Sequence, residues 1–296
     1  VGDIIAVQKS ADSPCFYAHV ISVSTTTLTV IPPLASVAAA GDRVKLLADF
    51  RMPTFGGDPV RSGGTSPLNT GSLPTVCLRL SGDGWRQICW GCQLTGLTIS
   101  GTEGDSRAVK LSVTVNVAYA EDVTPATPPV GVKYGAQVEH SLAAPLMVSA
   151  AYEAGTKPTS SITATAQPCV DQWTFTATWT CESSSCGNLW LGKAPLEAVS
   201  AEYSLEMYLG GTSLQNSLVF QFRAANYCGI SLGFDANLDD GETGGCLIIP
   251  AAYVNDGSVS TVDLGSGFVR THVQLAIGPN TLDATGDKPC VQLAIA

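Results

Sequence analysis

Apolar and polar residues alternate with a period of two over much of the chain. The alternation is strictest at residues 109–117, where every odd position is apolar and the even positions are Lys110, Ser112, Thr114 and Asn116. A looser alternation runs through residues 94–99, and the glycine-containing segment 101–105 separates the two. This pattern predicts a long β-hairpin with one face buried in its own domain and one polar face in contact with water.

A similar order of elements returns in the second half of the chain. Alternation predicts strands at residues 173–180, 203–209 and 218–223, with a turn at Gly210-Gly211 before the last of them. A tryptophan shortly followed by a glycine precedes the strands in both halves, at Trp90 and at Trp190. A final hairpin is predicted from residues 246–249, through a turn at 255–257, to a strand at 269–277 that turns Arg270, His272 and Gln274 away from its apolar side.

Turn residues divide the chain into three predicted domains. Short strands with turn residues between them predict a small β-barrel-like module over residues 1–50. A first larger β domain covers residues 51–150, with a long loop at 55–73 and a proline-rich linker at 123–135. A second such domain covers residues 151–296. One short helix is predicted at residues 140–151, interrupted by Pro145.

Composition supports an all-β fold and argues against nucleic acids and membranes as binding partners. Of the 296 residues, 45% are hydrophobic, which is enough for a sizeable core, and only 14% are charged. The net charge is −10 and there is no run of basic residues, which argues against tight binding to nucleic acid. No apolar run reaches the ~20 residues that a membrane-spanning helix needs. We therefore expect no membrane partner.

Two segments have an arrangement typical of metal sites. Residues 235–246 start like a calcium loop, but Asp240 stands where the glycine is required and Cys246 where the glutamate is required. Cys89 and Cys92 have the spacing of half a zinc site, but Cys181 and Cys186 are too far apart to complete it. We expect an acidic turn in the first case, and burial or a disulfide in the second. Free or partly paired thiols are expected among the ten cysteines.

No catalytic constellation follows from the remaining residues. Gly104-Asp105-Ser106 resembles a fragment of a serine-hydrolase motif, yet none of the three histidines, His19, His140 and His272, lies in a partner motif. The five tryptophans, at positions 85, 90, 173, 179 and 190, could form a sugar-binding platform but are expected in cores and interfaces. We predict no catalytic, cofactor-binding or metal-binding residues, no cofactor and no enzymatic activity.

The second half resembles the major tail tube protein of long-tailed, siphovirus-type bacteriophages. The similar parts lie within residues 190–278: the strand at 200–209 with the Gly-Gly turn after it, the strand at 218–224, the segment 245–253, and the strand at 267–277 with Arg270. Residues 89–120 resemble the matching piece of a preceding tube domain. The ten cysteines and residues 1–47 have no counterpart in the minimal family member.

The resemblance implies a structural protein of the virion tail, assembled in the host cytoplasm. Its β-sandwich or barrel domains would form stacked rings around a channel, through which DNA passes without specific binding. The family's single-domain members form hexameric rings, so two tandem domains would imply a trimer. Other tail proteins, including the tape measure, would be its partners. Two alternatives remain open: another virion structural protein, such as a capsid decoration, and a secreted β-sandwich adhesin or glycan-binding module.

Overall fold

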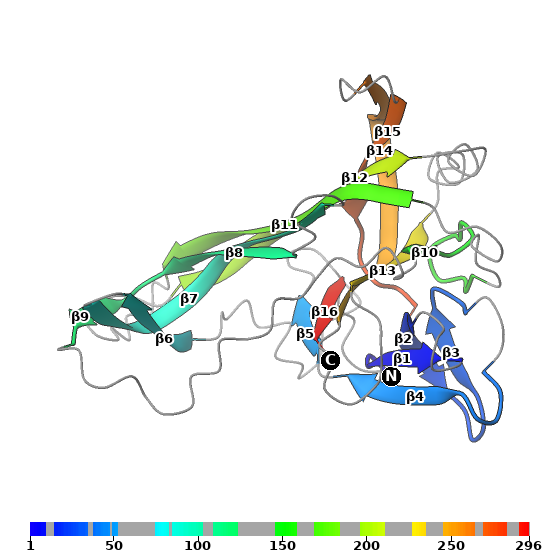
Figure 1. The fold of residues 1–296 in the computed structure, drawn as a ribbon, viewed down its shortest axis with the longest axis horizontal. Coiled ribbons are helices and arrows are strands. Elements are labelled where there is room, and N and C mark those ends of the chain that lie inside the picture. The colour runs from blue at the N-terminus through cyan, green and yellow to red at the C-terminus, as the bar shows by residue number, and fades with distance from the viewer. Residues whose placement is uncertain are drawn as a thin grey trace.

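The computed structural model describes residues 1–9, 15–34, 38–47, 49–52, 75–82, 85–102, 109–123, 146–158, 169–183, 196–210, 227–234, 245–263, 269–282 and 290–295. The described residues form β-strands arranged in two antiparallel sheets and contain no helix (Figure 1). The predicted all-β fold class is confirmed.

The N-terminal module is a four-stranded sheet with the order β3-β2-β1-β4. Its strands are β1 (Ile4–Gln8), β2 (Cys15–Val23), β3 (Leu28–Ile31) and β4 (Arg43–Leu47). β1 is apolar except for its last residue and is buried throughout. Such a strand needs cover on both faces. β3 and β4 are the edge strands of this sheet.

The second sheet has twelve strands, and its main path runs β10-β13-β14-β15-β12-β11-β7-β6. β8 and β9 pair with β7, while β16 pairs with β14 and β5. The strands are β5 (Asp49–Met52), β6 (Thr75–Gly82), β7 (Trp85–Thr102), β8 (Lys110–Asn116), β9 (Tyr119–Asp122), β10 (Leu146–Val148), β11 (Cys169–Ser183), β12 (Leu196–Gly210), β13 (Cys228–Phe234), β14 (Gly245–Asp263), β15 (Val269–Ile277) and β16 (Val291–Ile295).

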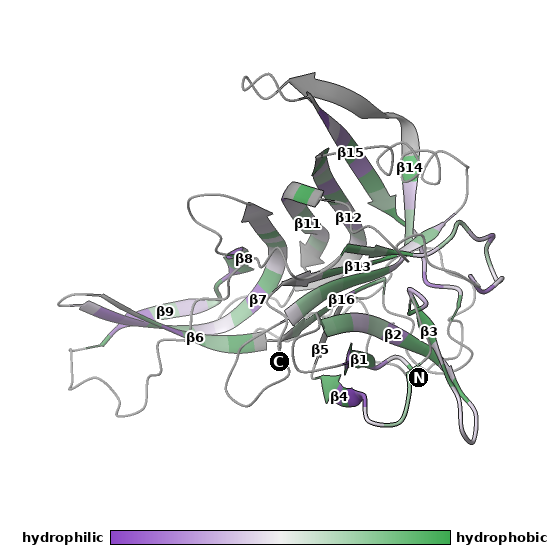
Figure 2. Cartoon of the chain, turned by 45° about the vertical axis from the view of Figure 1, so that its right-hand side comes forward, coloured by the Kyte–Doolittle hydropathy of each residue, from purple (hydrophilic) through white to green (hydrophobic). Residues whose placement is uncertain are grey.

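β14 connects the main core with the N-terminal sheet, because the first half of this strand is buried on both faces. Leu247 and Ile249 belong to the main core, where β13, β14 and β16 pack with β7, β11, β12 and β15. Cys246 and Ile248 instead pack with residues of the N-terminal sheet such as Ile4. Figure 2 shows hydrophobic positions along β2, β13 and β16, where the sheets meet. One strand therefore contributes to two cores.

Two of the predicted hairpins are present, β7–β8 and β14–β15, and each differs from the prediction at one end. β7 and β8 form an antiparallel pair, but β7 continues through Gly101, which pairs with Trp173 of β11 instead of starting a turn. The predicted turn at residues 255–257 is also wrong: β14 runs through it, and the register shifts there between Val254 and Val259. At Gly101, pairing with a distant strand outweighs the local turn preference of glycine. At 255–258, the extra residues form an irregularity within β14 and no turn.

The predicted helix at residues 140–151 is wrong over its described part. Residues 146–148 form β10, which pairs with residues 230–232 of β13. All three side chains of β10 are buried. A three-residue strand carries little local signal, and it is this long-range pairing that sets its conformation.

The hairpin strands of the two halves meet in one sheet. β7, from the first predicted tube domain, pairs directly with β11 from the second, over residues 96–102 and 172–178. Residues of both strands lie in the same core cluster. The partner strand predicted at 218–223, the loop at 55–73 and most of the linker at 123–135 lie outside the described residues.

Candidate functional site

A row of paired apolar residues crosses six strands, from the core to a strand edge. Phe175 of β11 lies opposite Leu205 of β12 on one side and opposite Ile99 of β7 on the other. Directly paired residues point to the same face of a sheet. The complete row is Val254, Leu275, Leu205, Phe175, Ile99 and Leu111. Ile99 is 2% exposed whereas Leu111, its neighbour on β8, is 59% exposed.

The next row repeats this change from buried to exposed. Leu97 of β7 is buried and lies between Ala177 of β11 and Val113 of β8, and Val113 is 46% exposed. The expectation that the apolar row of β8 packs inside its own domain is therefore wrong for Leu111 and Val113. β8 pairs with β7 alone among the described strands, and the exposure of Leu111 and Val113 shows that this face of β8 is not covered. Burying a leucine or valine side chain contributes about 1.5–3 kcal/mol. A contact with another chain that buried Leu111 and Val113 would gain this free energy.

The opposite face of the same strands is polar and mostly uncharged. One row is Ser112, Thr98, Thr176, Ser204 and Ala276. The adjacent row is Lys110, Ser100, Thr174, Glu206 and Gln274. Arg270, His272 and Gln274 lie at alternate positions to the buried Val273 and Leu275, as predicted. The sheet β8-β7-β11-β12-β15 thus has one apolar face and one face made largely of hydroxyl and amide groups.

A groove of about 610 Å³ lies on this polar side, over β11, β12 and β15. Its walls include Thr176, Thr178, Glu202, Gln274 and the aromatic ring of Tyr253. Hydroxyl, amide and carboxylate groups beside an aromatic ring provide the donors, acceptors and stacking surface that a small polar ligand uses. Alternation alone does not predict this groove, because its lining comes from four strands that are distant in sequence, β11, β12, β14 and β15.

The strands β6, β7 and β9 extend away from the body as an arm (Figure 1). Trp90 of β7 lies opposite Tyr119 of β9, and both side chains are exposed. The Trp90 indole N–H donates to Glu121 at 3.4 Å, and the Gln87 amide donates to Asp122 at 3.1 Å. Gly91 follows Trp90 with a φ of 62°, a left-handed conformation that favours glycine, at a bulge between β7 and β6.

Eight cysteines, at positions 15, 77, 89, 92, 181, 228, 246 and 290, are free thiols, and most of them are buried. Cys89 and Cys92 are both unbridged, and the Cys92 thiol donates to the Cys89 carbonyl at 3.4 Å. Burial raises the pKa of the Cys15 thiol to about 11 and that of Cys228 to about 12. A thiol with a raised pKa stays protonated and is a poor nucleophile or metal ligand at neutral pH. Cys228 and Cys290 belong to the main core, and Cys15 and Cys246 belong to the core beneath the N-terminal sheet.

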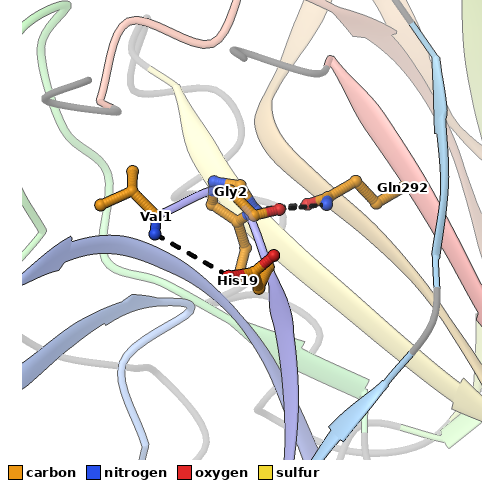
Figure 3. A network of polar contacts seen from close by, with 5 residues as sticks. Val1, Gly2, His19 and Gln292 are labelled. Atoms are coloured by element: carbon orange, nitrogen blue, oxygen red, sulfur yellow. Dashed lines mark hydrogen bonds and ion pairs between the residues drawn. The ribbon is translucent and has the colours of Figure 1, made fainter. Parts of the chain in front are cut away.

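A buried hydrogen-bond chain joins the first residues of the protein to its last strand. His19 Nδ1 donates to the side-chain oxygen of Gln292, and Gln292 Nε2 donates to the Gly2 carbonyl at 2.6 Å (Figure 3). His19 and Gln292 are both fully buried. Beside them the Val1 ammonium lies 3.9 Å from the Asp3 carboxylate. His19 is therefore a structural residue that ties β2 to β16.

The other motifs of the sequence do not meet in a site. Cys246 is buried in the core between β14 and the N-terminal sheet, while residues 235–244, the 104–106 fragment, His140 and Trp190 lie outside the described ranges. The ring of His272 contacts that of Tyr208 in a tilted arrangement, with ring centroids 4.8 Å apart and an interplanar angle of 35°. Trp173 and Trp179 are core residues, whereas Trp85 and Trp90 are exposed on the arm. Across the described residues there is no group of side chains suited to hold a metal ion.

A search of the described residues for a helix able to cross a membrane found none. Comparison of the chain with protein-family models found no match, and comparison with curated protein sequences found none either.

Proposed function

We propose that this protein is a structural subunit of a bacteriophage tail tube, which self-assembles into stacked rings around a DNA channel. One observation carries the proposal: the sheet formed by β8, β7, β11, β12 and β15 has an apolar face that reaches an exposed edge at Leu111. An exposed apolar edge strand favours association with another chain. The polar back of the same sheet can remain in water after such an association.

The chemistry of the polar face suits a channel through which DNA passes. Its rows contain mainly Ser and Thr side chains, with Glu202 and Glu206 near the middle and Lys110 at one edge. The chain as a whole carries a net charge of −10. A face without clustered cations does not hold phosphates, and net negative charge repels the DNA backbone. DNA would slide along this face without binding to it.

The shared sheet supports one tube unit per chain. β7 and β11 pair directly, so the two halves contribute to a single core. In the family that the sequence resembles, subunits with one tube unit form hexameric rings. We therefore expect six copies in each ring, in place of the trimer that two independent tube domains would form. The N-terminal sheet of β1–β4 would lie on the outside of the tube.

The partners follow from this role. The protein would contact itself within and between rings, and it would contact the tape measure and other tail proteins. It would be assembled in the host cytoplasm and reside in the virion tail. We propose no catalysed reaction and no cofactor.

A second candidate function rests on the groove beside Tyr253. An aromatic ring next to Glu202, Gln274 and two threonines is typical of a glycan-binding surface. The protein would then be an adhesin or a glycan-binding module. Eight of the ten cysteines, at positions 15, 77, 89, 92, 181, 228, 246 and 290, are free thiols, which favours the tube role over a secreted domain stabilised by disulfides.

Sedimentation velocity separates the two functions. A tube subunit sediments as ring-sized or larger assemblies, while a glycan-binding module of 30.6 kDa sediments as a monomer. The Tyr253→Ala variant is the matched control. It should leave the assembly unchanged if the protein is a tube subunit. A monomeric wild-type protein that loses glycan binding on this substitution would overturn the tube proposal.

A further inference from the structure

The groove over β11, β12 and β15 has a negatively charged side. Among the described residues that line it, Glu202 of β12 alone carries a charge, and Glu202 is exposed. Thr178 lies directly opposite Glu202 on β11, and Ser204 follows on the same face of β12. Carboxylate and hydroxyl oxygens accept hydrogen bonds. This side of the groove therefore offers acceptors and a charge that attracts cations.

The β14 side of the groove has an aromatic ring that its neighbours hold in place. Tyr253 of β14 lies opposite Ala276 of β15, and both line the groove. The rings of Tyr253 and Tyr227 meet edge to face, with centroids 5.8 Å apart and an interplanar angle of 81°. Tyr227 also contacts Tyr152, with centroids 6.0 Å apart, and the Tyr152 hydroxyl donates to the Pro250 carbonyl at 2.6 Å. A fixed aromatic ring of this kind can bind a cation.

A second carboxylate lies beside the groove on the same face of β12. Glu206 is directly opposite Gln274 of β15, which lines the groove. Glu202 and Glu206 are four residues apart, which places their Cα atoms about 13 Å apart along the strand. Ser204 lies between them. A single ammonium group does not contact both carboxylates at this separation, whereas a linear molecule with several ammonium groups spans them.

We propose that this groove binds a linear polyamine, with one ammonium group at Glu202 and another near Glu206. The methylene chain between them would lie over Ser204 and its neighbour Ala276, beside the ring of Tyr253. Ammonium groups donate hydrogen bonds and accept none, which matches a lining of acceptors. The carboxylates repel an anion and give a neutral sugar no opposite charge to pair with.

This ligand site goes beyond the proposed tube role. All of the described lining belongs to one chain, so the site does not depend on the assembly state. The glycan-binding alternative uses the same groove, and its ligand is neutral where a polyamine is positively charged. The charge of the ligand therefore separates the two.

Isothermal titration calorimetry of the full chain with spermidine tests the site. Spermidine should bind saturably with one site per chain, and propylamine, with a single ammonium group, should bind at least about fivefold more weakly. Glu202→Gln should weaken spermidine binding about fivefold, and Glu202→Gln with Glu206→Gln at least about tenfold. Tyr253→Leu should weaken it about twofold to fivefold, whereas Tyr253→Phe keeps the ring and should bind like the wild type.

A matched control separates the groove from a general attraction of cations to a chain with a net charge of −10. Glu121→Gln removes one carboxylate from β9 of the arm and should leave spermidine binding unchanged. Thermal melting checks that every variant is folded, and the trisaccharide maltotriose should not displace spermidine.

Three results would overturn the polyamine site: no saturable binding of spermidine, equal losses in Glu121→Gln and Glu202→Gln, or displacement of spermidine by maltotriose. A protein that stays monomeric and binds spermidine as described would support this site and overturn the tube role alone.

Discussion

Gly101 of β7 lies directly opposite Trp173 of β11, and the indole ring of Trp173 occupies the space that a side chain at Gly101 would need. A Cβ atom placed on Gly101 would lie 2.5 Å from the indole Nε1. Trp173 is fully buried in the main core. The pairing of β7 with β11 therefore requires glycine at position 101.

Gly101→Ala should lower the stability of the protein. The added methyl group forces the buried Trp173 ring to move, and such overpacking typically costs about 1–3 kcal/mol. Urea unfolding followed by tryptophan fluorescence measures the change. Gly96→Ala in the same strand is the control, since its Cβ would meet Thr114 at an ordinary 3.4 Å. Equal effects of the two substitutions would contradict the close approach at Gly101.

Gln292→Ala should destabilise the junction between the N-terminal sheet and β16. The substitution removes the acceptor for His19 Nδ1 and the donor to the Gly2 carbonyl. Both of these hydrogen bonds are buried. Loss of a buried hydrogen-bond partner costs about 1–3 kcal/mol. A thermal melt should show a clear decrease in Tm, while Gln274→Ala on the exposed side of β15 should leave it nearly unchanged.

Alkaline pH should weaken the folded protein through its buried thiols. The folded-state pKa of Cys15 is raised from 9.0 to about 11 and that of Cys228 to about 12 by burial. Below pH 9 both thiols are protonated in the folded and the unfolded chain, so their contribution is fully present. Above pH 9 the unfolded chain loses these protons first, and each thiol lowers the free energy of unfolding by about 1.4 kcal/mol per pH unit up to its folded-state pKa.

Urea titrations at pH 8, 9, 10 and 11 measure this slope. Cys228→Ala should make the fall between pH 9 and 11 shallower, whereas Cys77→Ala removes an exposed thiol and should not. A slope unchanged by Cys228→Ala would show that other groups cause the alkaline loss.

Replacing the exposed apolar residues of β8 should reduce association and spare the fold. In the variant Leu111→Ser with Val113→Ser, both changed side chains are already largely exposed, so the free energy of unfolding should change by less than about 0.5 kcal/mol. The larger assemblies seen by size-exclusion chromatography with light scattering should decrease. Ile99→Ala, on the buried side of the same row, should instead cost about 2–5 kcal/mol of stability. Full assembly of the β8 variant would contradict a role for this edge.

The alternation of residues predicts most of the strands correctly, because a period of two is a local property of the chain. It predicts the β7–β8 hairpin, β11, β12 and the outward side of β15. It does not predict which strands meet: β7 pairs with β11 across about seventy residues, and that choice depends on tertiary packing.

The same limit explains the errors at the candidate site. The pattern of β8 matches that of a half-buried strand, but its burial depends on whether another layer covers it, and Leu111 has none among the described residues. The tie between His19 and Gln292 joins residues 273 positions apart, so no local pattern indicates it.

Electron microscopy of the purified, untagged chain tests the proposed self-assembly most directly. Negatively stained particles should show rings or stacked tubes with an open central channel, and class averages should show sixfold symmetry. Compact, separate particles of monomer size, at concentrations where a tail tube protein would assemble, would contradict the proposal.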